Sequence, residues 1–199
     1  MSNNKTTEIE IEKYQNAMIV DLEATCCDKN SVPKEEMETI EIGAVMVNLK
    51  SLKILSDFQI FIKPVRHPKL TEFCTRLTSI NQADVDQALL YAEAIQKFQK
   101  WMKQYSNFVF CSWGSYDRSQ LEKDSSFHKL PYPIAAAHIN IKTLFSERQK
   151  FKKRYGMKEA LNLTELPLAG THHRGIDDAR NMVQLMPYVL GWKTVSKKP

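Results

Sequence analysis

Two acidic residues follow the first apolar run of the chain. Ala17–Val20 is short and apolar, which predicts a buried strand, and Asp21 and Glu23 come directly after it. Residues i and i+2 of a strand point to the same face, so the two carboxylates should converge. A solvated loop is the ordinary explanation of such a pair. At the end of a buried run, however, acids are costly unless they bind a cation or are paired.

A third acid, Asp117, opens a short helix expected over Ser115–Lys123, which follows a strand expected over Asn107–Ser112. Leu121, four residues later, shares the helical face of Asp117 and should tie that face to the core. The alternative is that Asp117 is an ordinary helix N-terminal acid, stabilised only by the positive end of the helix dipole.

The segment 171–179 holds two histidine–aspartate pairs with the same spacing, His172 with Asp177 and His173 with Asp178. In the helix that follows, Asp178 shares its stripe with apolar residues and should face the protein body, whereas Asp177 should face water. The apolar stripe continues with Met182 and Leu185, and the polar stripe with Arg180, Asn181 and Gln184. We therefore favour Asp178 as a ligand and His173 as its partner, with Asp177 as an early-helix acid.

Four carboxylates and one histidine on three separate segments suit phosphodiester hydrolysis. Hard carboxylate oxygens are the ligands that Mg²⁺ and Mn²⁺ prefer. Two such ions about 3.5–4 Å apart stabilise the attacking and leaving oxygens of a phosphodiester displacement. A neutral imidazole, with an unperturbed pKa of about 6.5, can accept the proton of the attacking water.

Alternating and periodic apolar patterns predict the elements that would position these residues. Strands over Thr39–Asn48 and Ile54–Ile62 form a hairpin, and the clearest helix covers Ala83–Tyr105. Later elements are a strand at Ile139–Ile141 and helices at Tyr155–Leu163 and Asp177–Leu190, the last kinked or ended by Pro187. A hairpin followed by alternating strands and helices predicts an α/β fold with a mixed sheet flanked by helices.

Length and composition limit the number of domains and the class of protein. The chain has 199 residues with a formal charge of +5 and 43% apolar residues, which indicates one folded domain and excludes extensive disorder. No apolar stretch is long enough to cross a membrane, and no secretory signal is visible. We expect a flexible lead-in over 1–15, a domain over 16–192 and a C-terminal tail over 193–199.

Four cysteines, Cys26, Cys27, Cys74 and Cys111, have no metal-binding spacing. We interpret them as free thiols that act as small apolar residues in a reducing compartment, so we expect a cytoplasmic protein.

Together these motifs resemble those of the DEDDh 3′–5′ exonucleases of the ribonuclease H-like superfamily. Asp21–Thr25 looks like the first motif, D-x-E-x-T, and Trp113–Asp117 with Leu121 looks like the second. His173–Asp178 looks like the third, H-x4-D. The linker over His67–Gln82 and the segment Ile139–Lys142 resemble the enhanced-RNAi (ERI) type, and bacterial KapD-like exonucleases share the pattern. The resemblance covers residues 16–190.

The resemblance implies a ribonuclease H-like five-stranded mixed sheet, with an antiparallel hairpin first and helices on both faces. It implies that two Mg²⁺ or Mn²⁺ ions are ligated by Asp21, Glu23, Asp117 and Asp178, with His173 as general base. The backbone at Ala24 and Thr25 would contact the terminal sugar, and nucleoside 5′-monophosphates would leave from the 3′ end. We expect no extra N-terminal nucleic-acid-binding domain of the kind that some relatives carry, because the 15 leading residues are too few for it.

Two further sets of side chains could hold the strand. Phe73 and Tyr116 could stack on bases, which is worth about 1–3 kcal/mol per base, although core packing is equally reasonable. Lys152, Lys153 and Arg154 lie in a basic run between Arg148 and Lys158 that could follow phosphates, or could simply be a solvated face.

The leading interpretation is a metal-dependent 3′–5′ exonuclease acting on RNA 3′ ends, single-stranded or overhanging. One alternative is the same enzyme acting on DNA, including single-stranded DNA. The other is a catalytically silent module that only binds RNA ends; loss of a carboxylate would favour it, and none is lost.

Overall fold

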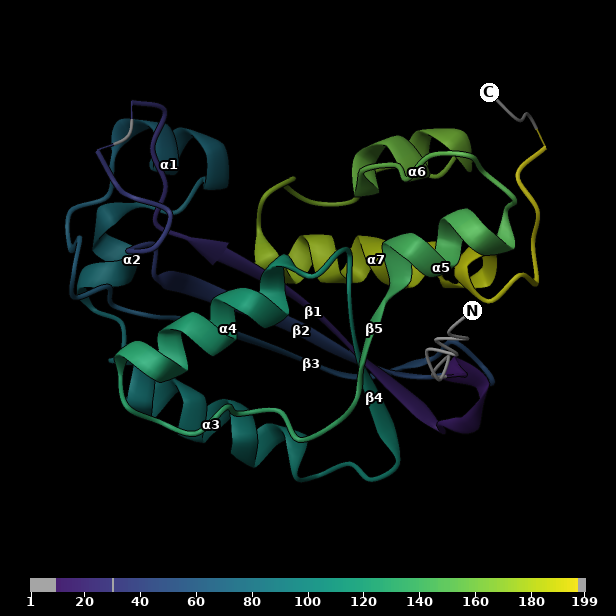
Figure 1. Cartoon of the computed structure of the whole chain (residues 1–199), viewed down its shortest axis with the longest axis horizontal. Helices are drawn as coiled ribbons and strands as arrows, with labels where there is room; N and C mark the ends of the chain where they lie inside the picture. The colour runs from purple at the N-terminus through teal and green to yellow at the C-terminus, as the bar shows by residue number, and fades with distance from the viewer. Residues whose placement is uncertain (1–9, 30, 197–199) are drawn as a thin grey trace, which may run out of the picture.

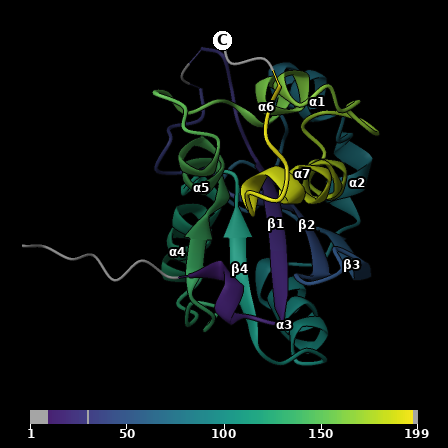
Figure 2. The ribbon, with the colours of Figure 1, turned by 90° about the vertical axis from the view of Figure 1, so that its right-hand side faces the viewer.

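The computed structural model describes residues 10–29 and 31–196. A mixed five-stranded sheet has the order β3-β2-β1-β4-β5. Its strands are β1 (Asn16–Ala24), β2 (Thr39–Asn48), β3 (Ile54–Phe61), β4 (Phe108–Ser112) and β5 (His138–Asn140). Strand β1 pairs antiparallel with β2 and parallel with β4, so it is central (Figures 1 and 2). The predicted fold class, α/β with a hairpin first, is confirmed.

Helices cover both faces of this sheet (Figure 1). They are α1 (Glu72–Thr78), α2 (Gln82–Asp86), α3 (Tyr91–Met102), α4 (Tyr116–Phe127), α5 (Ile141–Arg148), α6 (Met157–Leu163) and α7 (Gly175–Val189), and a 3₁₀ turn, η1, covers Ile11–Lys13. None of the helices in the described part of the chain is long and apolar enough to span a membrane.

Strand alternation divides the core into two layers. Ala17 and Ile19 of β1 face a cluster formed with α5, α6 and α7. Met18 and Val20 face a second cluster formed with α3 and α4. A strand buried on both faces reads as a continuous apolar run, which is why the sequence marks β1 so clearly.

The prediction of one continuous helix over Ala83–Tyr105 is wrong, because the structure has two separate helices there, α2 and α3. Between them, Leu89 forms a β-bridge with Ile62, and its carbonyl accepts a hydrogen bond from the Lys63 amide at 2.9 Å. This tertiary pairing overrides the helical period of the local sequence. Helices α1 and α5 are not predicted by the apolar pattern. Pro187 lies inside α7, which continues to Val189.

The two ends of the described chain pack against the body. Ile11, within the lead-in expected to be flexible, is 1% exposed and belongs to the core cluster with α7. Val195, within the expected C-terminal tail, is buried, and its amide donates to Gln149 Oε1 at 2.8 Å. The predictions for residues 1–9 and 197–199 lie outside the described residues.

Two glycines allow the start of α7 to approach the sheet at backbone distance. A Cβ added to Gly43 on β2 would lie 2.0 Å from the Gly175 carbonyl carbon, and one added to Gly175 would lie 2.8 Å from the Asp21 carbonyl oxygen. Gly43 is also the cross-strand partner of Asp21. Because neither glycine has a side chain, the first turn of α7 can lie directly over Asp21.

Gly43→Ala should consequently lower the free energy of unfolding by about 3 kcal/mol or more, because its methyl group would meet backbone that cannot rotate away. Gly156→Ala is the matched control, since its Cβ would meet only the flexible Glu159 side chain at 3.3 Å. Thermal melting of both variants measures the difference. Equal melting temperatures for the two variants would contradict this account of the α7 contact.

Candidate active site

Asp21 and Glu23 lie at the carboxyl end of β1, where the central strand leaves the core. They are two residues apart on a strand, and their carboxylate oxygens converge as predicted. Together with Asp178 they form a group whose ligand atoms all lie within 4.8 Å of one another. Glu23 is 8% exposed and Asp178 is 4% exposed, whereas Asp21 is half-buried, so most of the group is sheltered from bulk water.

Asp117 joins this group from the first turn of α4. Its Oδ1 accepts a hydrogen bond at 3.0 Å from the Leu22 amide, which lies between the two β1 acids. The side chain is 4% exposed, and Leu121 on the same helical face is fully buried. Asp117 therefore belongs to the site and is not a solvated helix-terminal acid.

The prediction that Asp178 faces the protein body is confirmed, whereas Asp177 is half-buried and accepts a hydrogen bond from the Thr171 amide at 2.9 Å. The predicted polar, water-facing stripe is wrong at Asn181, which is fully buried. The Asn181 amide group pairs with both backbone groups of Ala169, each at 2.9 Å. It thus fixes the loop that leads into α7.

The four carboxylates, those of Asp21, Glu23, Asp117 and Asp178, repel one another in a poorly solvated place. Burial, followed by the neighbouring acids, raises the pKa of Asp21 and of Glu23 well above the usual range. Burial also raises the pKa of Asp117, to about 6, against the opposing effect of its hydrogen bonds. Among the described residues, no lysine or arginine forms an ion pair with any of these four acids.

Divalent cations fit this donor set. Mg²⁺ and Mn²⁺ prefer hard oxygen ligands such as these carboxylates. A bound cation would also offset the repulsion between the four acids. By contrast, Glu41 is a fully buried acid with an internal partner, since Arg174 Nε lies 3.1 Å from its Oε2. The Gly175 amide donates to the same oxygen at 3.1 Å.

Sequence reasoning missed the Glu41–Arg174 pair. Glu41 is the cross-strand partner of Glu23, and it ties β2 to the residue that precedes α7. One signal was present in the sequence, because Glu41 is the single charged residue within the apolar strand Thr39–Asn48.

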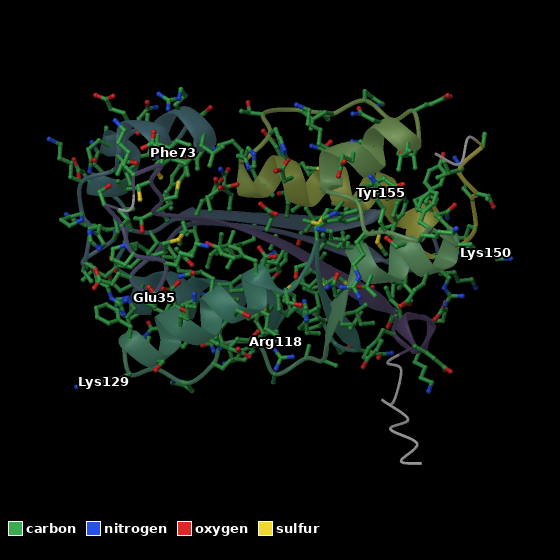
Figure 3. The ribbon with its side chains drawn as sticks, turned by 45° about the horizontal axis from the view of Figure 1, so that its top comes forward. Glu35, Phe73, Arg118, Lys129, Lys150 and Tyr155 are labelled. Carbon is green, nitrogen blue, oxygen red and sulfur yellow. The ribbon has the colours of Figure 1, made fainter. Side chains whose placement is uncertain are left out.

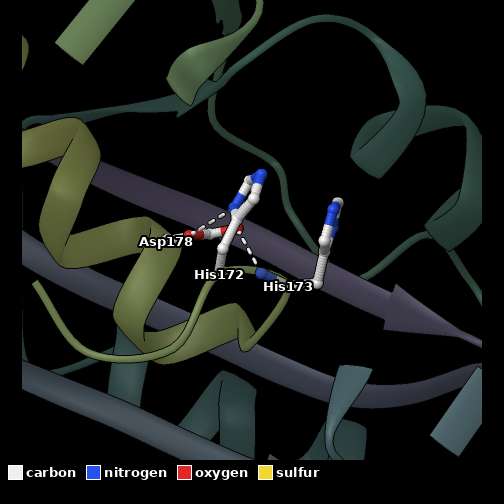
Figure 4. Close-up of side chains that lie close together, drawn as sticks. All are labelled: His172, His173 and Asp178. Carbon is white, nitrogen blue, oxygen red and sulfur yellow. Dashed lines mark hydrogen bonds and ion pairs between the residues drawn. The ribbon is translucent and has the colours of Figure 1, made fainter. Parts of the chain in front are cut away.

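The two histidines lie on the turn before α7 (Figure 4). His172 Nδ1 lies 2.9 Å from Asp178 Oδ2, and the backbone amide of His173 donates to the same oxygen at 3.0 Å. The imidazole rings stack with centroids 3.9 Å apart. His173 has φ +62°, a left-handed conformation that is uncommon for residues other than glycine. Burial, then the adjacent His172, lowers the pKa of His173, which favours a neutral ring able to accept a proton.

The residues proposed to contact the strand come from the end of β1 and from helices α1 and α4. Ala24 is 5% exposed and Thr25 only 2%, and the amide and hydroxyl of Thr25 are both used in hydrogen bonds with Glu38. Tyr116 is 46% exposed beside Asp117. Phe73 on α1 is half-buried, with the Arg76 guanidinium 5.9 Å from its ring centre. Both aromatic rings thus retain surface that could contact a base.

The basic run lies in the loop between α5 and α6. Lys152, Lys153 and Arg154 are exposed, and the next residue, Tyr155, is buried. The Tyr155 carbonyl accepts a hydrogen bond at 3.0 Å from Trp113 Nε1, which joins this loop to the segment that leads into Asp117. Figure 3 labels Tyr155 and Lys150 on this part of the molecule and Phe73 on the opposite side.

Comparisons with known proteins agree with this geometry. The family model RNase_T, described as Exonuclease, matches residues 18–186. The 3′-5′ exonuclease Snipper of Drosophila melanogaster is 31% identical over 202 residues, which cover 92% of this chain and 72% of Snipper. The 3′-5′ exoribonuclease 1 of Rattus norvegicus is 33% identical, and the match covers 86% of this chain and 52% of the rat protein.

A solved structure gives the same result. The nuclease domain of 3′hExo, a DEDDh family member bound to rAMP, superposes with a TM-score of 0.77 and 27% identity, covering 88% of this chain and 90% of that chain. The chain belongs to the DEDDh 3′–5′ exonuclease family. Its resemblance to the ERI type is likewise confirmed, since several curated relatives are ERI1 exoribonucleases.

The clustered acids of the site should destabilise the folded chain when no cation is present. Glu23→Gln should raise the melting temperature in EDTA at pH 7.5. The raised pKa of Glu23, about 9, means that folding at this pH must either protonate the side chain or bury its charge beside other acids, and glutamine carries neither cost. A gain of about 1 kcal/mol corresponds to roughly 2–4 °C for a chain of this size. Differential scanning fluorimetry in EDTA measures it.

Glu36→Gln is a matched control, because Glu36 is exposed and pairs only with His67. A Glu23→Gln variant that melts at or below the wild-type temperature in EDTA would show that the cluster does not destabilise the cation-free protein.

Proposed function

We propose that this chain is a metal-dependent 3′–5′ exonuclease that shortens RNA from single-stranded or overhanging 3′ ends and releases nucleoside 5′-monophosphates. One observation carries the proposal: the carboxylates of Asp21, Glu23 and Asp178 converge within 4.8 Å, with Asp117 beside them on the Leu22 amide, and within residues 10–29 and 31–196 no lysine or arginine pairs with them. The relatives support it, because their names describe 3′-5′ exoribonucleases. A similar structure, with TM-score 0.82, is a 3′-exonuclease that recognises the 3′ end of a histone mRNA stem-loop.

Two Mg²⁺ or Mn²⁺ ions would be held by Asp21, Glu23, Asp117 and Asp178. When bound, they would supply electrostatic stabilisation of the scissile phosphate and of the attacking and leaving oxygens. The protein supplies the rest. His173 accepts the proton of the attacking water, and the lowered pKa of its half-buried ring keeps it neutral for that role near pH 7.

Neighbouring side chains hold the strand. Tyr116 presents an exposed ring next to Asp117, and Phe73 presents its ring from α1, so each could stack on a base near the 3′ end. Ala24 and Thr25 form the backbone that follows Glu23, against which the terminal sugar would rest. The amide of Thr25 donates to the Glu38 carbonyl at 2.8 Å, so the protein itself holds this backbone in place.

The proposed location is the cytoplasm. All four cysteines in the chain are free thiols, Cys74 and Cys111 being buried, which suits a reducing compartment.

The direct test is a 5′-labelled single-stranded RNA incubated with Mg²⁺ or Mn²⁺, next to a matched DNA. We expect a ladder that shortens from the 3′ end of the RNA, is abolished by EDTA, and is blocked by a 3′-phosphate. His173→Ala should slow it by about 100-fold or more. Asp177→Asn is the control and should keep wild-type activity, because Asp177 lies outside the carboxylate cluster.

Absence of shortening with either ion would refute the proposal. A faster digest of the DNA would assign the enzyme to DNA, and binding without hydrolysis would support the silent RNA-end module.

The basic loop gives a separate prediction about binding. In an Asp178→Asn background, replacing Lys152, Lys153 and Arg154 by Gln should flatten the slope of log affinity for single-stranded RNA against log salt by about 2, as expected for three lost phosphate contacts. The matched control replaces Lys97, Lys100 and Lys103, which are exposed along α3 and its C-terminal end on the other side of the sheet. Equal salt slopes for the two triple variants would contradict a phosphate-following role of the loop.

A further inference from the structure

Asp178 differs from the other three site acids in how its side chain is held. Its Oδ2 accepts two hydrogen bonds, at 2.9 Å from His172 Nδ1 and at 3.0 Å from the His173 amide (Figure 4). Its Oδ1 has only the longer 3.2 Å contact to His172 Nδ1. An ionised carboxylate, the form that ligates a cation, can only accept hydrogen bonds, so in that form His172 would donate to Asp178 from a protonated Nδ1.

The contact is specific to the first histidine of the pair. The His172 ring reaches Asp178, whereas His173 contributes its backbone amide and leaves its ring stacked on His172. The left-handed φ of His173 separates the two roles, since it turns consecutive side chains to the same side of the loop. His172 is thus placed to act on Asp178 without replacing His173.

We infer that His172 is a positioning residue, which fixes the Asp178 carboxylate so that Oδ2 is satisfied within the protein and Oδ1 remains available as a cation ligand. The inference rests on the proposed function, because it takes the carboxylate cluster as the cation site. Outer hydrogen-bond partners of this kind orient ligands and raise their affinity for the metal, and their loss typically costs 10–100-fold in metal affinity or activity.

Alternative explanations of the contact predict different behaviour. If His172 only stabilised the loop, its removal would lower the melting temperature in EDTA and leave cation binding unchanged. If only the volume of the ring mattered, a smaller side chain with a donor at the same place would not compensate. An asparagine provides that test, because its amide nitrogen occupies nearly the position of Nδ1 and can donate to Oδ2.

The experiment is isothermal titration of Mn²⁺ into the full chain at one fixed pH, for wild type, His172→Ala, His172→Asn and Thr171→Ala. We expect His172→Ala to raise the Mn²⁺ dissociation constant by about 10-fold or more, with its melting temperature in EDTA unchanged. His172→Asn should return to within about 3-fold of wild type. Thr171→Ala is the control, because the side chain of Thr171 is exposed and only its backbone amide is used.

Unchanged Mn²⁺ affinity in His172→Ala, or equal losses in the Ala and Asn variants, would overturn the inference while wild-type binding and RNA shortening remain. Failure of the wild-type chain to bind Mn²⁺ would instead remove the proposed function, and the inference with it.

Discussion

Mutual repulsion among four sheltered carboxylates is the constraint on which the rest of this structure depends. Asp21, Glu23, Asp117 and Asp178 come from three segments, and burial together with their neighbours raises the pKa of the β1 acids well above the usual range. The fold must hold these groups together against their charge. Both apolar faces of β1 contribute to this, since the strand is anchored in two core layers before it presents the first two acids.

The fourth acid depends on an unusually close contact. Gly43 and Gly175 let the backbone of α7 rest against β1 and β2, which brings Asp178 to the end of the central strand. Arg174 then pairs with Glu41 at the entrance of the helix, so its charge is already engaged. The Arg174–Glu41 pair fixes the start of the helix that carries Asp178 and leaves the four site acids without an arginine partner among the described residues. A divalent cation is the partner that the remaining charge suits.

Local sequence patterns predicted the elements in which apolar residues repeat with the regular spacing of one strand or one helix. The strands β1, β2 and β3 follow from their apolar runs, and Asp178 follows from its stripe with Met182 and Leu185. The helix break at Leu89 could not be predicted, because it arises from pairing with Ile62, which is distant in sequence. The role of His172 was equally inaccessible, since it depends on the left-handed backbone of His173. The Glu41–Arg174 pair joins residues 133 apart, a contact that no local spacing reveals.

The most direct measurement of the central claim is the location of the bound cations. Crystals grown with Mn²⁺ and a nucleoside 5′-monophosphate, recorded at the manganese absorption edge, should show anomalous peaks among Asp21, Glu23, Asp117 and Asp178. The account predicts two peaks within coordination distance of these oxygens. Anomalous density elsewhere on the surface, with the four carboxylates free of manganese, would contradict it.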